Sequence, residues 1–404
     1  MTDFIVTNAR LFCATDENVI EGGVLWVRGD RIHAVGTAAE MVDLPGDANI
    51  VDAGGRFLMP GMTETHAHLS FADASPFAIG ATPVEEATLS AVRNADKMLR
   101  AGFTGAVSFG SAYRIDVALR NAINAGQIPG PRLLAAGRDL GATASNVDSP
   151  GGLSQIADGP WAVRKAVREQ RRQGVDIVKA FIDGEAINPV NPPGELSFCD
   201  EELNALVDEA HRRRLRVAVH ARSAAAVKQS VNAGADLIGH ANYLDDEAIE
   251  LLAAKADHLF VGPAIAWEMQ YLAQCESLGV PRHVAVAQGY EAEIDATCRT
   301  VEKLRKTDVR LVVGGDYGIS IAPHGTYAKD LEYFVDLFGM RPAEALICAT
   351  RNGGEAMAKD GLTGTLEKGS YADFVLVDGD PLADIAVLQD SARLAVYKGG
   401  TVHY

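Results

Sequence analysis

The chain has 404 residues, with 37 Lys and Arg against 54 Asp and Glu, and a formal charge of −17 at pH 7. This length predicts two or three domains, or one barrel-sized domain with an appendage, and a 48% hydrophobic, 23% charged composition excludes a disordered chain or a disulfide scaffold. The acidic balance argues against nucleic acid or an anionic membrane as partner and favours a small-molecule substrate.

The cysteine pattern and the termini bear on the compartment. There are five cysteines, an odd number, and no two of them form a C-x-x-C motif. This predicts buried thiols in a reducing compartment rather than disulfides or a cysteine zinc site. The first residues lack a basic region followed by a long apolar stretch, and no later run reaches the roughly 18 apolar residues of a membrane span. We therefore expect a cytoplasmic protein without a membrane segment.

Both ends of the chain carry short strand-like runs punctuated by Gly, Asn and Asp. Up to about Met59 these runs are FIVTNARLF, GGVLWVRGDRIHAVG and IVDAGGRFLM. After about Leu362 the same texture returns in GTLEKGSYADFVLVDGD and RLAVYKGGTVHY. Such runs are typical of short antiparallel strands joined by turns. We expect residues 1–59 and 362–404 to form one small composite β-sandwich domain.

Residues 60–361 have a different texture, in which short apolar runs alternate with helix-period segments. The eight runs are MTETHAHL, TGAVSF, PRLLAAG, VDIVKAF, LRVAVH, LIGH, HLFVG and VRLVVGGD. Eight strands alternating with helices predict an α/β fold, a (β/α)8 TIM-type barrel. An open doubly wound sheet is the alternative, but no G-x-G-x-x-G follows the first of these strands.

A set of possible metal ligands falls at the ends of these runs. His66 and His68 lie two apart on the first strand, so both imidazoles point to the same face and can reach one ion. The other members, at or near the ends of the fourth, fifth, sixth and eighth strands, are Lys179, His220, His240 and Asp316. Barrel enzymes place their catalytic groups at this rim. Singly, each residue is better explained as a core histidine, a snorkelling lysine or a helix-capping aspartate, but random placement of the whole set on one rim is improbable.

The donor types in this set suit two Zn²⁺-like ions. Four imidazoles and two oxygen donors are sufficient, provided that Lys179 supplies an anionic oxygen. An ordinary ammonium has no lone pair, whereas a lysine N-carboxylated by carbon dioxide presents a bridging carboxylate. The alternative for Lys179 is a structural pair with an acid.

The motifs PGMTETHAHL, DIVKAF, VAVHARS, LIGHANYLDDEAIELLA, VVGGD and GTLEKGSYADFVLVDGDPLADI resemble the amidohydrolase superfamily, in its imidazolonepropionase-related and Xaa-Pro-dipeptidase-like branch. The resemblance covers essentially the whole chain. It implies a binuclear zinc centre with one ion on His66, His68 and Asp316. The second ion is expected on His220 and His240, bridged to the first by carboxylated Lys179. It also implies a homo-oligomer, from dimer to octamer.

The resemblance implies hydrolysis of an amide-type C–N bond in an amide, carbamate or urea. A hydroxide shared by the metals would attack the carbonyl, and Asp316 would be the catalytic residue that passes a proton to the leaving nitrogen. The alternatives are an Xaa-Pro-type dipeptidase or an N-acyl amino acid hydrolase, and a non-catalytic barrel protein. Single-metal deamination is a minor alternative, because Ser223 stands where that branch carries a glutamate.

Three residues are candidate substrate contacts. Tyr243 matches a position where relatives hydrogen-bond the scissile carbonyl, or it packs over the rim. Arg222 stands where dipeptidase-like relatives carry a second histidine, and it would clamp a substrate carboxylate or pair with an acid on a neighbouring loop. His324, in a P-H-G pattern, would line the pocket or face solvent.

Two further features bear on the substrate class. The segment GRDLGATASNVDSPGG after the third strand lacks the histidine that peptide-cleaving relatives commonly show there. Trp267 and Tyr271 would form an apolar wall, although their spacing of four also fits a helix packed on a core. Together these features favour an aryl or alkyl amide, carbamate or urea over a dipeptide.

Overall fold

The centre of the molecule is built from parallel strands, which confirms the α/β class. The computed structural model describes residues 3–41, 44–46, 48–148, 153–186, 188, 191–357 and 361–404. The parallel strands form two sheets, ordered β6-β7-β8 and β10-β9-β11-β12-β13-β14-β15. Their bounds are β6 Met62–Ala67, β7 Phe103–Ser108, β8 Arg132–Leu134, β9 Asp139–Gly141, β10 Ser154–Ile156, β11 Ile177–Phe181, β12 Arg216–Ser223, β13 Leu237–Tyr243, β14 Phe260–Gly262 and β15 Arg310–Leu311.

Each of the eight apolar runs contains one of these strands, as predicted. The residues of β6, β7 and β11 are buried throughout, as expected for strands covered on both faces. Strands β9 and β10 are additional and lie in and just after the Gly- and Ser-rich segment that follows the third run. A backbone hydrogen bond of 3.0 Å from Thr65 to the Val313 carbonyl connects the first of the eight strands to the residues that follow the last.

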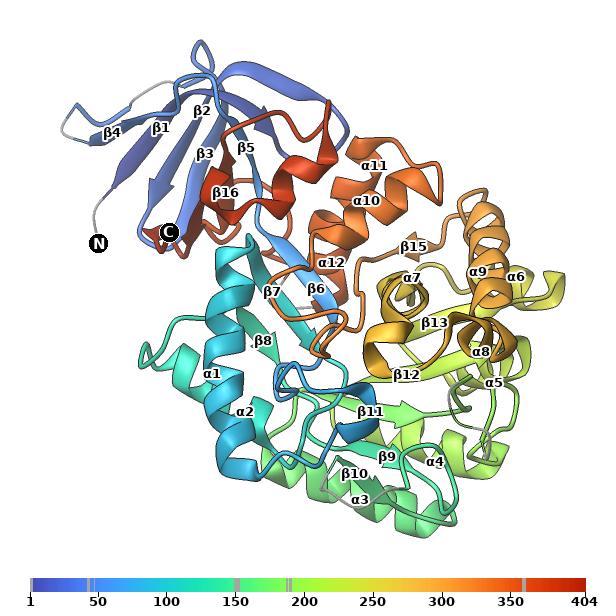
Figure 1. Ribbon diagram of the computed structural model, residues 1–404. Coiled ribbons are helices and arrows are strands. Elements are labelled where there is room, and N and C mark those ends of the chain that lie inside the picture. The colour runs from blue at the N-terminus through green and yellow to red at the C-terminus, as the bar shows by residue number, and fades with distance from the viewer. Residues whose placement is uncertain are drawn as a thin grey trace.

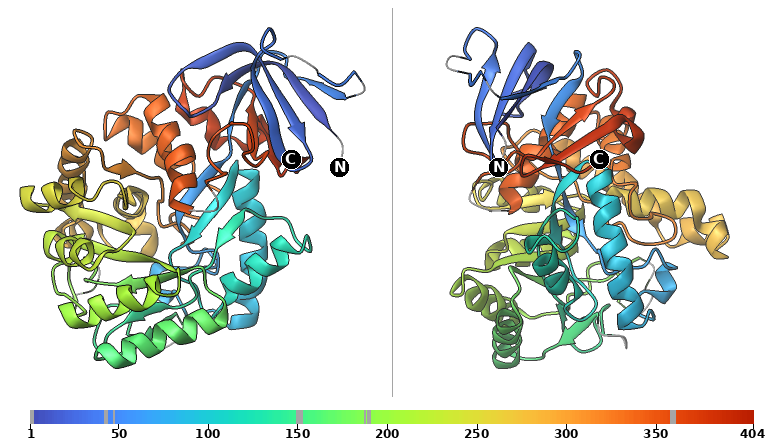
Figure 2. Two further views of the ribbon diagram at one scale, coloured as in Figure 1. Left: turned by 180° about the vertical axis from the view of Figure 1, so that it is seen from behind. Right: turned by 90° about the vertical axis from the view of Figure 1, so that its left-hand side faces the viewer.

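Helices surround the parallel strands and follow them along the chain (Figures 1 and 2). Their bounds are α1 Val84–Arg100, α2 Ile115–Asn124, α3 Pro160–Gln173, α4 Asp200–His211, α5 Ala224–Ala233, α6 Asp246–Ala253, α7 Ile265–Gln274, α8 Arg282–Ala287, α9 Tyr290–Leu304, α10 Lys329–Asp336, α11 Pro342–Ile347 and α12 Gly353–Met357. Most are amphipathic. In α1, for example, Ala87, Ala91, Ala95 and Met98 form a buried stripe at helical spacing.

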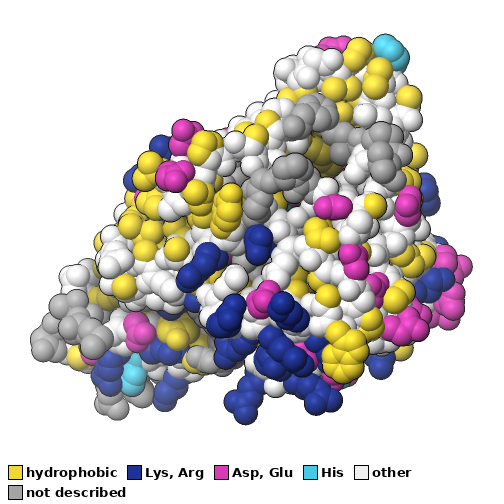
Figure 3. All heavy atoms as spheres, turned by 90° about the horizontal axis from the view of Figure 1, so that it is seen from below, with side chains coloured by type: hydrophobic (Ala, Val, Ile, Leu, Met, Phe, Trp, Pro, Cys, Tyr) yellow, Lys and Arg dark blue, Asp and Glu magenta, His cyan; other side chains and the backbone are white. Residues whose placement is uncertain are grey.

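Surface charge is unevenly distributed despite the acidic total. Figure 3, which views the molecule from below, shows Lys and Arg side chains gathered on this face. Helix α3 lies at the bottom of Figure 1 and exposes Lys165, Arg168 and Arg171. Its opposite side buries Val163 and Val167. The charge on α3 therefore belongs to the polar face of an amphipathic helix.

The two ends of the chain share one eight-stranded sheet, as the strand-like runs predicted. The order is β18-β17-β16-β5-β1-β2-β3, with β4 paired to β1. The bounds are β1 Phe4–Phe12, β2 Val19–Arg28, β3 Arg31–Thr37, β4 Asn49–Asp52, β5 Phe57–Pro60, β16 Phe374–Val377, β17 Leu394–Lys398 and β18 Thr401–Val402. In Figure 1 the strands from both ends lie together above the parallel strands.

This terminal sheet is strongly curled. Phe4 on β1 and Tyr397 on β17 have ring centroids 5.9 Å apart, although β5 and β16 lie between their strands. In a flat sheet three strand intervals would separate them by about 14 Å. At the other end, Ile32 of β3 donates a hydrogen bond of 2.9 Å to the Ser370 carbonyl. The sheet thus encloses its own apolar core, which includes Phe4, Leu25 and Phe374.

The passage from the terminal sheet to the parallel strands is short, because β5 ends at Pro60 and β6 begins at Met62. The division into domains at residues 59/60 and 361/362 stays a prediction. Among the helices of the described residues, none combines the length and the apolar character that crossing a membrane requires.

Candidate functional site

A cavity of about 390 Å³ lies at the carboxyl ends of the parallel strands. Five of the six predicted metal ligands line it: His66, His68, Lys179, His220 and Asp316. The sixth, His240, lies directly behind them, with its ring centroid 4.2 Å from that of His220 and 5.0 Å from that of His66. The structure therefore brings all six residues together from five different strands or strand ends.

The first group of possible ligand atoms comes from His66, His68 and Asp316. One ligand atom from each lies within 4.8 Å of the others. The Asp316 carboxylate is 3.2 Å from His68 Nε2 and 3.7 Å from His66 Nε2. His68 Nδ1 is 3.0 Å from the Gly110 carbonyl, and donation there leaves the Nε2 lone pair free. A second contact of this kind is typical of metal-binding histidines.

The second group comes from Glu185, His220 and His240, whose ligand atoms also lie within 4.8 Å of one another. His220 Nε2 and both ring nitrogens of His240 are buried without a hydrogen-bond partner among the described residues. Buried polar atoms normally have a partner, because burying one alone costs about 1–3 kcal/mol. A divalent cation would satisfy these nitrogens, so the donor set fits a metal.

Lys179 is 1% exposed and reaches the same cavity from β11. Its Nζ lies 4.9 Å from the ring centroid of Phe109 and 5.1 Å from that of Phe181. Burial lowers the pKa of this amine, while the carboxylates of Asp139 and Asp316 oppose the shift. The site thus surrounds an amine with imidazoles, aromatic rings and acids.

Burial dominates the electrostatics of the ligand set. It holds the pKa values of His66, His220 and His240 well below the usual range, so these imidazoles are neutral at pH 7 and can donate lone pairs. For Asp316, burial alone would raise the pKa, but the contacts that its carboxylate makes with the imidazoles of His66 and His68 outweigh burial and hold the pKa below its usual range. Asp316 is therefore ionised.

Close packing around His66 depends on two glycines. A Cβ at Gly314 would lie 2.8 Å from the His66 backbone nitrogen, and one at Gly239 would lie 2.7 Å from the Phe109 ring. The backbone is also strained at two ligands, since φ is 76° at His240 and 61° at Asp316. Non-glycine residues rarely adopt such angles, and they concentrate at functional sites.

Phenylalanine rings pack against three of the histidines. Phe109 packs on His66, Phe71 stacks on His68, and Phe181 stacks on His220 at a centroid distance of 3.7 Å. These contacts fix the ring planes without using the ring nitrogens. Other apolar side chains line part of the remaining wall, among them Ile79, Val147, Leu153, Trp267 and Ile319.

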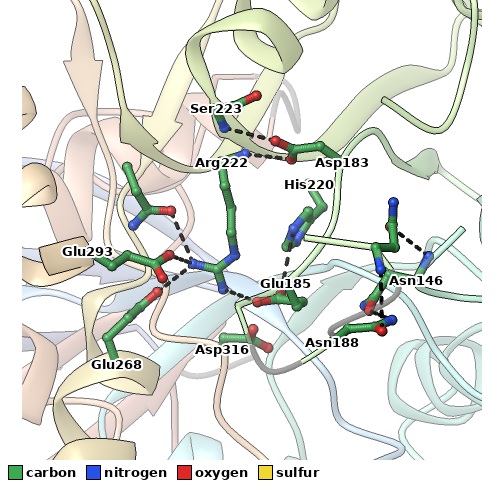
Figure 4. A network of polar contacts seen from close by, with 12 residues as sticks. Asn146, Asp183, Glu185, Asn188, His220, Arg222, Ser223, Glu268, Glu293 and Asp316 are labelled. Atoms are coloured by element: carbon green, nitrogen blue, oxygen red, sulfur yellow. Dashed lines mark hydrogen bonds and ion pairs between the residues drawn. The ribbon is translucent and has the colours of Figure 1, made fainter. Parts of the chain in front are cut away.

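Arg222 is fully buried and does not line the cavity. Its guanidinium pairs with Glu185 and Glu268, each at 2.7 Å, and also with Glu293 (Figure 4). The structure thus shows an ion pair with an acid on a neighbouring loop, which was the alternative to a substrate clamp. With three carboxylates already around its guanidinium, the predicted contact with a substrate carboxylate is not supported by this geometry.

Tyr243 and His324 also lie outside the residues that line the cavity. Tyr243 ends β13 and hydrogen-bonds Glu293, and burial raises the pKa of its phenol. His324 is 4% exposed, with Nδ1 2.7 Å from the Tyr327 hydroxyl and Nε2 3.1 Å from the Phe71 carbonyl. His324 therefore supports the backbone of Phe71, which does line the cavity. Neither position supports a direct substrate contact.

Of the two residues expected to form an apolar wall, Trp267 lines the cavity and Tyr271 does not. Tyr271 packs behind Trp267, with the two ring centroids 5.6 Å apart.

The cavity is also lined by polar residues that the sequence patterns did not single out, which are Ser111, Asp139, Asn146, Glu185 and Asn188. Burial raises the pKa of Asp139, and burial raises the pKa of Glu185 to about 7. Asp139 and Glu185 follow the third and fourth apolar runs by a few residues, so their position after barrel-type strands was an available signal.

Comparison with known proteins agrees with this geometry. The family model described as "Amidohydrolase family" matches residues 57–402. An ochratoxinase from Aspergillus niger is 30% identical over 370 residues, which cover 85% of this chain and 75% of that protein. An imidazolonepropionase from Symbiobacterium thermophilum is 26% identical over 392 residues, covering 90% of this chain and 85% of the relative.

Solved structures show the same likeness. A prolidase in complex with N-methylphosphonate-L-proline matches with a TM-score of 0.90 and 26% identity, and covers 100% of this chain and 99% of that one. The A. niger ochratoxinase structure matches with a TM-score of 0.87 and 26% identity, and covers 99% and 95%.

Proposed function

We infer the function from one premise, which is that this chain belongs to the amidohydrolase family, in its imidazolonepropionase- and prolidase-related branch. It is accordingly a hydrolase of amide-type bonds. We propose, more narrowly, that it is a binuclear metal hydrolase that cleaves an amide, carbamate or urea C–N bond of a small molecule.

The observation that carries this proposal is the pair of ligand groups gathered at one cavity. His66, His68 and Asp316 would hold one divalent cation, and His220 and His240 would hold the other. Neutral imidazoles beside carboxylates match the preferences of Zn²⁺. Bound there, two such ions supply an activated water at neutral pH and polarisation of the substrate carbonyl.

Lys179 would bridge the two ions as an N-carboxylated lysine. Its position in the same cavity supports this role, and a buried free ammonium between two cations would be strongly unfavourable. The lowered pKa of Lys179 favours the neutral amine, the form that can react with carbon dioxide.

Asp316 is the residue we assign to proton transfer. It is ionised and lines the cavity beside both His66 and His68, so it can accept a proton from the attacking water. The same carboxyl then delivers the proton to the nitrogen of the departing amine. The strained φ of 61° at Asp316 holds the carboxylate toward this point.

The cavity wall favours a substrate with an apolar group. A volume of about 390 Å³ suits a small molecule, and Phe71, Val147, Leu153 and Trp267 supply apolar contacts. We therefore place aryl and alkyl amides, carbamates and ureas first. An Xaa-Pro dipeptide or an N-acyl amino acid is the second candidate, supported by the likeness to the prolidase complex.

We also propose that the parallel strands close into a (β/α)8 barrel and that the terminal strands form a β-sandwich. The Thr65–Val313 hydrogen bond supports the closed barrel, and the curled terminal sheet supports the sandwich. We also propose a cytoplasmic homo-oligomer that takes a small-molecule substrate and binds neither nucleic acid nor membranes.

Metal analysis tests the proposal directly. Zinc per chain is measured by plasma mass spectrometry, and hydrolysis is measured before chelation, after chelation and after return of Zn²⁺. We expect two ions per chain, and activity that is lost and then restored. A fully active preparation free of metal would overturn the proposal.

The substrate class is tested with a panel of anilides, carbamates, phenylureas, Xaa-Pro dipeptides and N-acyl amino acids. We expect turnover of the first three classes. Turnover confined to the last two would favour the second candidate, and no turnover by fully metal-loaded protein would favour a non-catalytic role.

Lys179→Ala tests the bridge, with Lys329→Ala as a control, since Lys329 lies on α10 and pairs with Glu332. We expect Lys179→Ala to lose at least one ion per chain and the control to keep both. Two tightly bound ions in Lys179→Ala would show that the bridging role is wrong.

A further inference from the structure

Glu185 is a partly buried carboxylate at the metal cavity that the family's six-residue ligand set does not contain. It lies in the loop after β11, four residues beyond Phe181, and lines the cavity with 14% of its side chain exposed. We propose that Glu185 is a third protein ligand of the cation held by His220 and His240, in addition to the bridging Lys179. This inference rests on the proposed binuclear centre.

The distance between Glu185 and His220 suits two ligands of one ion. Glu185 Oε1 is 3.6 Å from His220 Nε2, which is longer than a good hydrogen bond. Two ligands bound tetrahedrally at 2.0–2.2 Å lie about 3.4 Å apart. The ligand atoms of Glu185, His220 and His240 all fall within 4.8 Å of one another. A small contraction around a cation would complete the site.

The histidines supply a second, independent observation. Both are 1% exposed, and His220 Nε2 and the ring nitrogens of His240 have no hydrogen-bond partner among the described residues. Glu185 lies next to this unpartnered side of His220, and Figure 4 marks the contact between the two side chains. A carboxylate ligand with two imidazoles is an established combination for zinc.

The loop that carries Glu185 is fixed to β12, the strand that carries His220. The Asp183 carboxylate accepts hydrogen bonds from the backbone nitrogens of Arg222 at 2.8 Å and Ser223 at 2.9 Å. At Gly184 a Cβ would lie 1.6 Å from the Asn191 carbonyl oxygen, so the chain passes through a space that only glycine can occupy. Glu185 is therefore positioned by the backbone as well as by its own contacts.

Arg222 orients the carboxylate. Its Nη2 lies 2.7 Å from Glu185 Oε2, which leaves Oε1 as the oxygen closer to His220. The guanidinium is itself held by Glu268 and Glu293 and by the Asn242 side chain at 3.1 Å. Ligating carboxylates are commonly hydrogen-bonded in this way by a second layer of residues. Arg222 is therefore a positioning residue for Glu185.

The experiment compares Zn²⁺ binding by wild type and Glu185→Gln, by competition with a chelator of known affinity. Glu268→Gln and Glu293→Gln are matched controls, because they remove a carboxylate from the same arginine without touching His220. The cobalt-substituted proteins are compared by visible absorption, which reports coordination independently of activity. Thermal unfolding confirms that each variant is folded.

We expect Glu185→Gln to keep one tight Zn²⁺ and to bind the second at least about tenfold more weakly, since even a change in the second layer costs 10–100-fold. Its cobalt spectrum should change, and the spectra of both controls should match wild type. Two Zn²⁺ ions bound by Glu185→Gln within about twofold of wild-type affinity would overturn the inference, as would equal losses in the controls.

The outcomes separate this inference from the proposed function. Wild type that binds fewer than two ions would overturn the binuclear centre, and the Glu185 assignment with it. If wild type binds two ions and Glu185→Gln binds them with the same affinity, only the Glu185 assignment is overturned. If Glu185→Gln does not fold, Glu185→Asp replaces it, because it keeps the charge for Arg222 but withdraws the carboxylate by one methylene. It is expected to weaken the second ion, and unchanged binding would again overturn the inference.

Discussion

The guanidinium of Arg222 and the carboxylate of Glu268 lie 2.7 Å apart, and neither side chain is exposed to solvent. Glu293 and Glu185 also pair with Arg222, so three carboxyl groups surround one guanidinium. This arrangement joins the loop after β11 to β12, α7 and α9. The cluster therefore connects the candidate metal site to the helices behind it.

Removing the Arg222 guanidinium from this cluster should lower the free energy of unfolding. Arg222→Met takes the guanidinium away from three acids, and loss of one member of a buried pair typically costs about 3–5 kcal/mol in the free energy of unfolding. Urea unfolding of the metal-free proteins measures this without a contribution from bound ions. The matched change Glu268→Gln keeps the arginine and the side-chain shape and should cost less than about half as much. Equal losses would contradict this account of the cluster.

The same cluster predicts how stability depends on pH. Burial raises the pKa of Glu268 from 4.5 to about 8, so its carboxyl binds a proton more tightly in the folded chain than in the unfolded chain. The stability contributed by this group is fully present below about pH 4.5 and is lost as the pH rises through about 8. Unfolding free energies measured across this interval should fall less steeply for Glu268→Gln than for wild type. Parallel slopes would show that Glu268 does not titrate in this way.

Close packing at Gly314 should be necessary both for the stability of the fold and for Zn²⁺ binding. In Gly314→Ala the new methyl would meet the His66 backbone nitrogen and Cβ at 2.8 Å, so β6 must move. We expect lower stability by about 1–3 kcal/mol and weaker Zn²⁺ binding. Gly262→Ala on neighbouring β14 is the control, because its methyl would meet nothing closer than 3.4 Å and should leave both quantities nearly unchanged. A tolerated Gly314→Ala would show that His66 does not require this close approach.

The sequence predicted those parts of the molecule that depend on local pattern. Apolar runs alternating with helical segments placed all eight strands, and His66, His68 and Asp316 could be selected because their position at or just after the end of a strand fixes the side on which they lie. The Arg222 cluster was not predictable in the same way. Its partners Glu268 and Glu293 lie on helices more than 40 residues further along the chain and become neighbours only in the folded molecule.

Two differences have a similar physical origin. Strand β9 lies in Gly- and Ser-rich sequence and β10 lies just after it, and pairing of β9 with β11 and of β10 with β9, rather than residue propensity, creates these strands. His324 follows a motif that suggested a pocket residue, but its ring nitrogens are used by Tyr327 and the Phe71 backbone. A motif gives the residue type and its place in the chain, while packing decides which side of the cavity wall the ring occupies.

Trp267 should control the preference for substrates with an aromatic group. Its ring lines the cavity and is 7% exposed, and Tyr271 packs behind it at 5.6 Å. In Trp267→Leu part of the apolar wall is lost, so kcat/KM for an anilide should fall about tenfold relative to the corresponding methylamide, which corresponds to about 1.4 kcal/mol. The comparison uses substrates that wild type hydrolyses, with thermal unfolding to confirm a folded variant. Tyr271→Phe removes only a hydroxyl that contacts Gln288 at 3.1 Å and should keep the wild-type ratio. An unchanged ratio in Trp267→Leu would mean that the aromatic group binds elsewhere in the cavity, against Phe71 or Leu153.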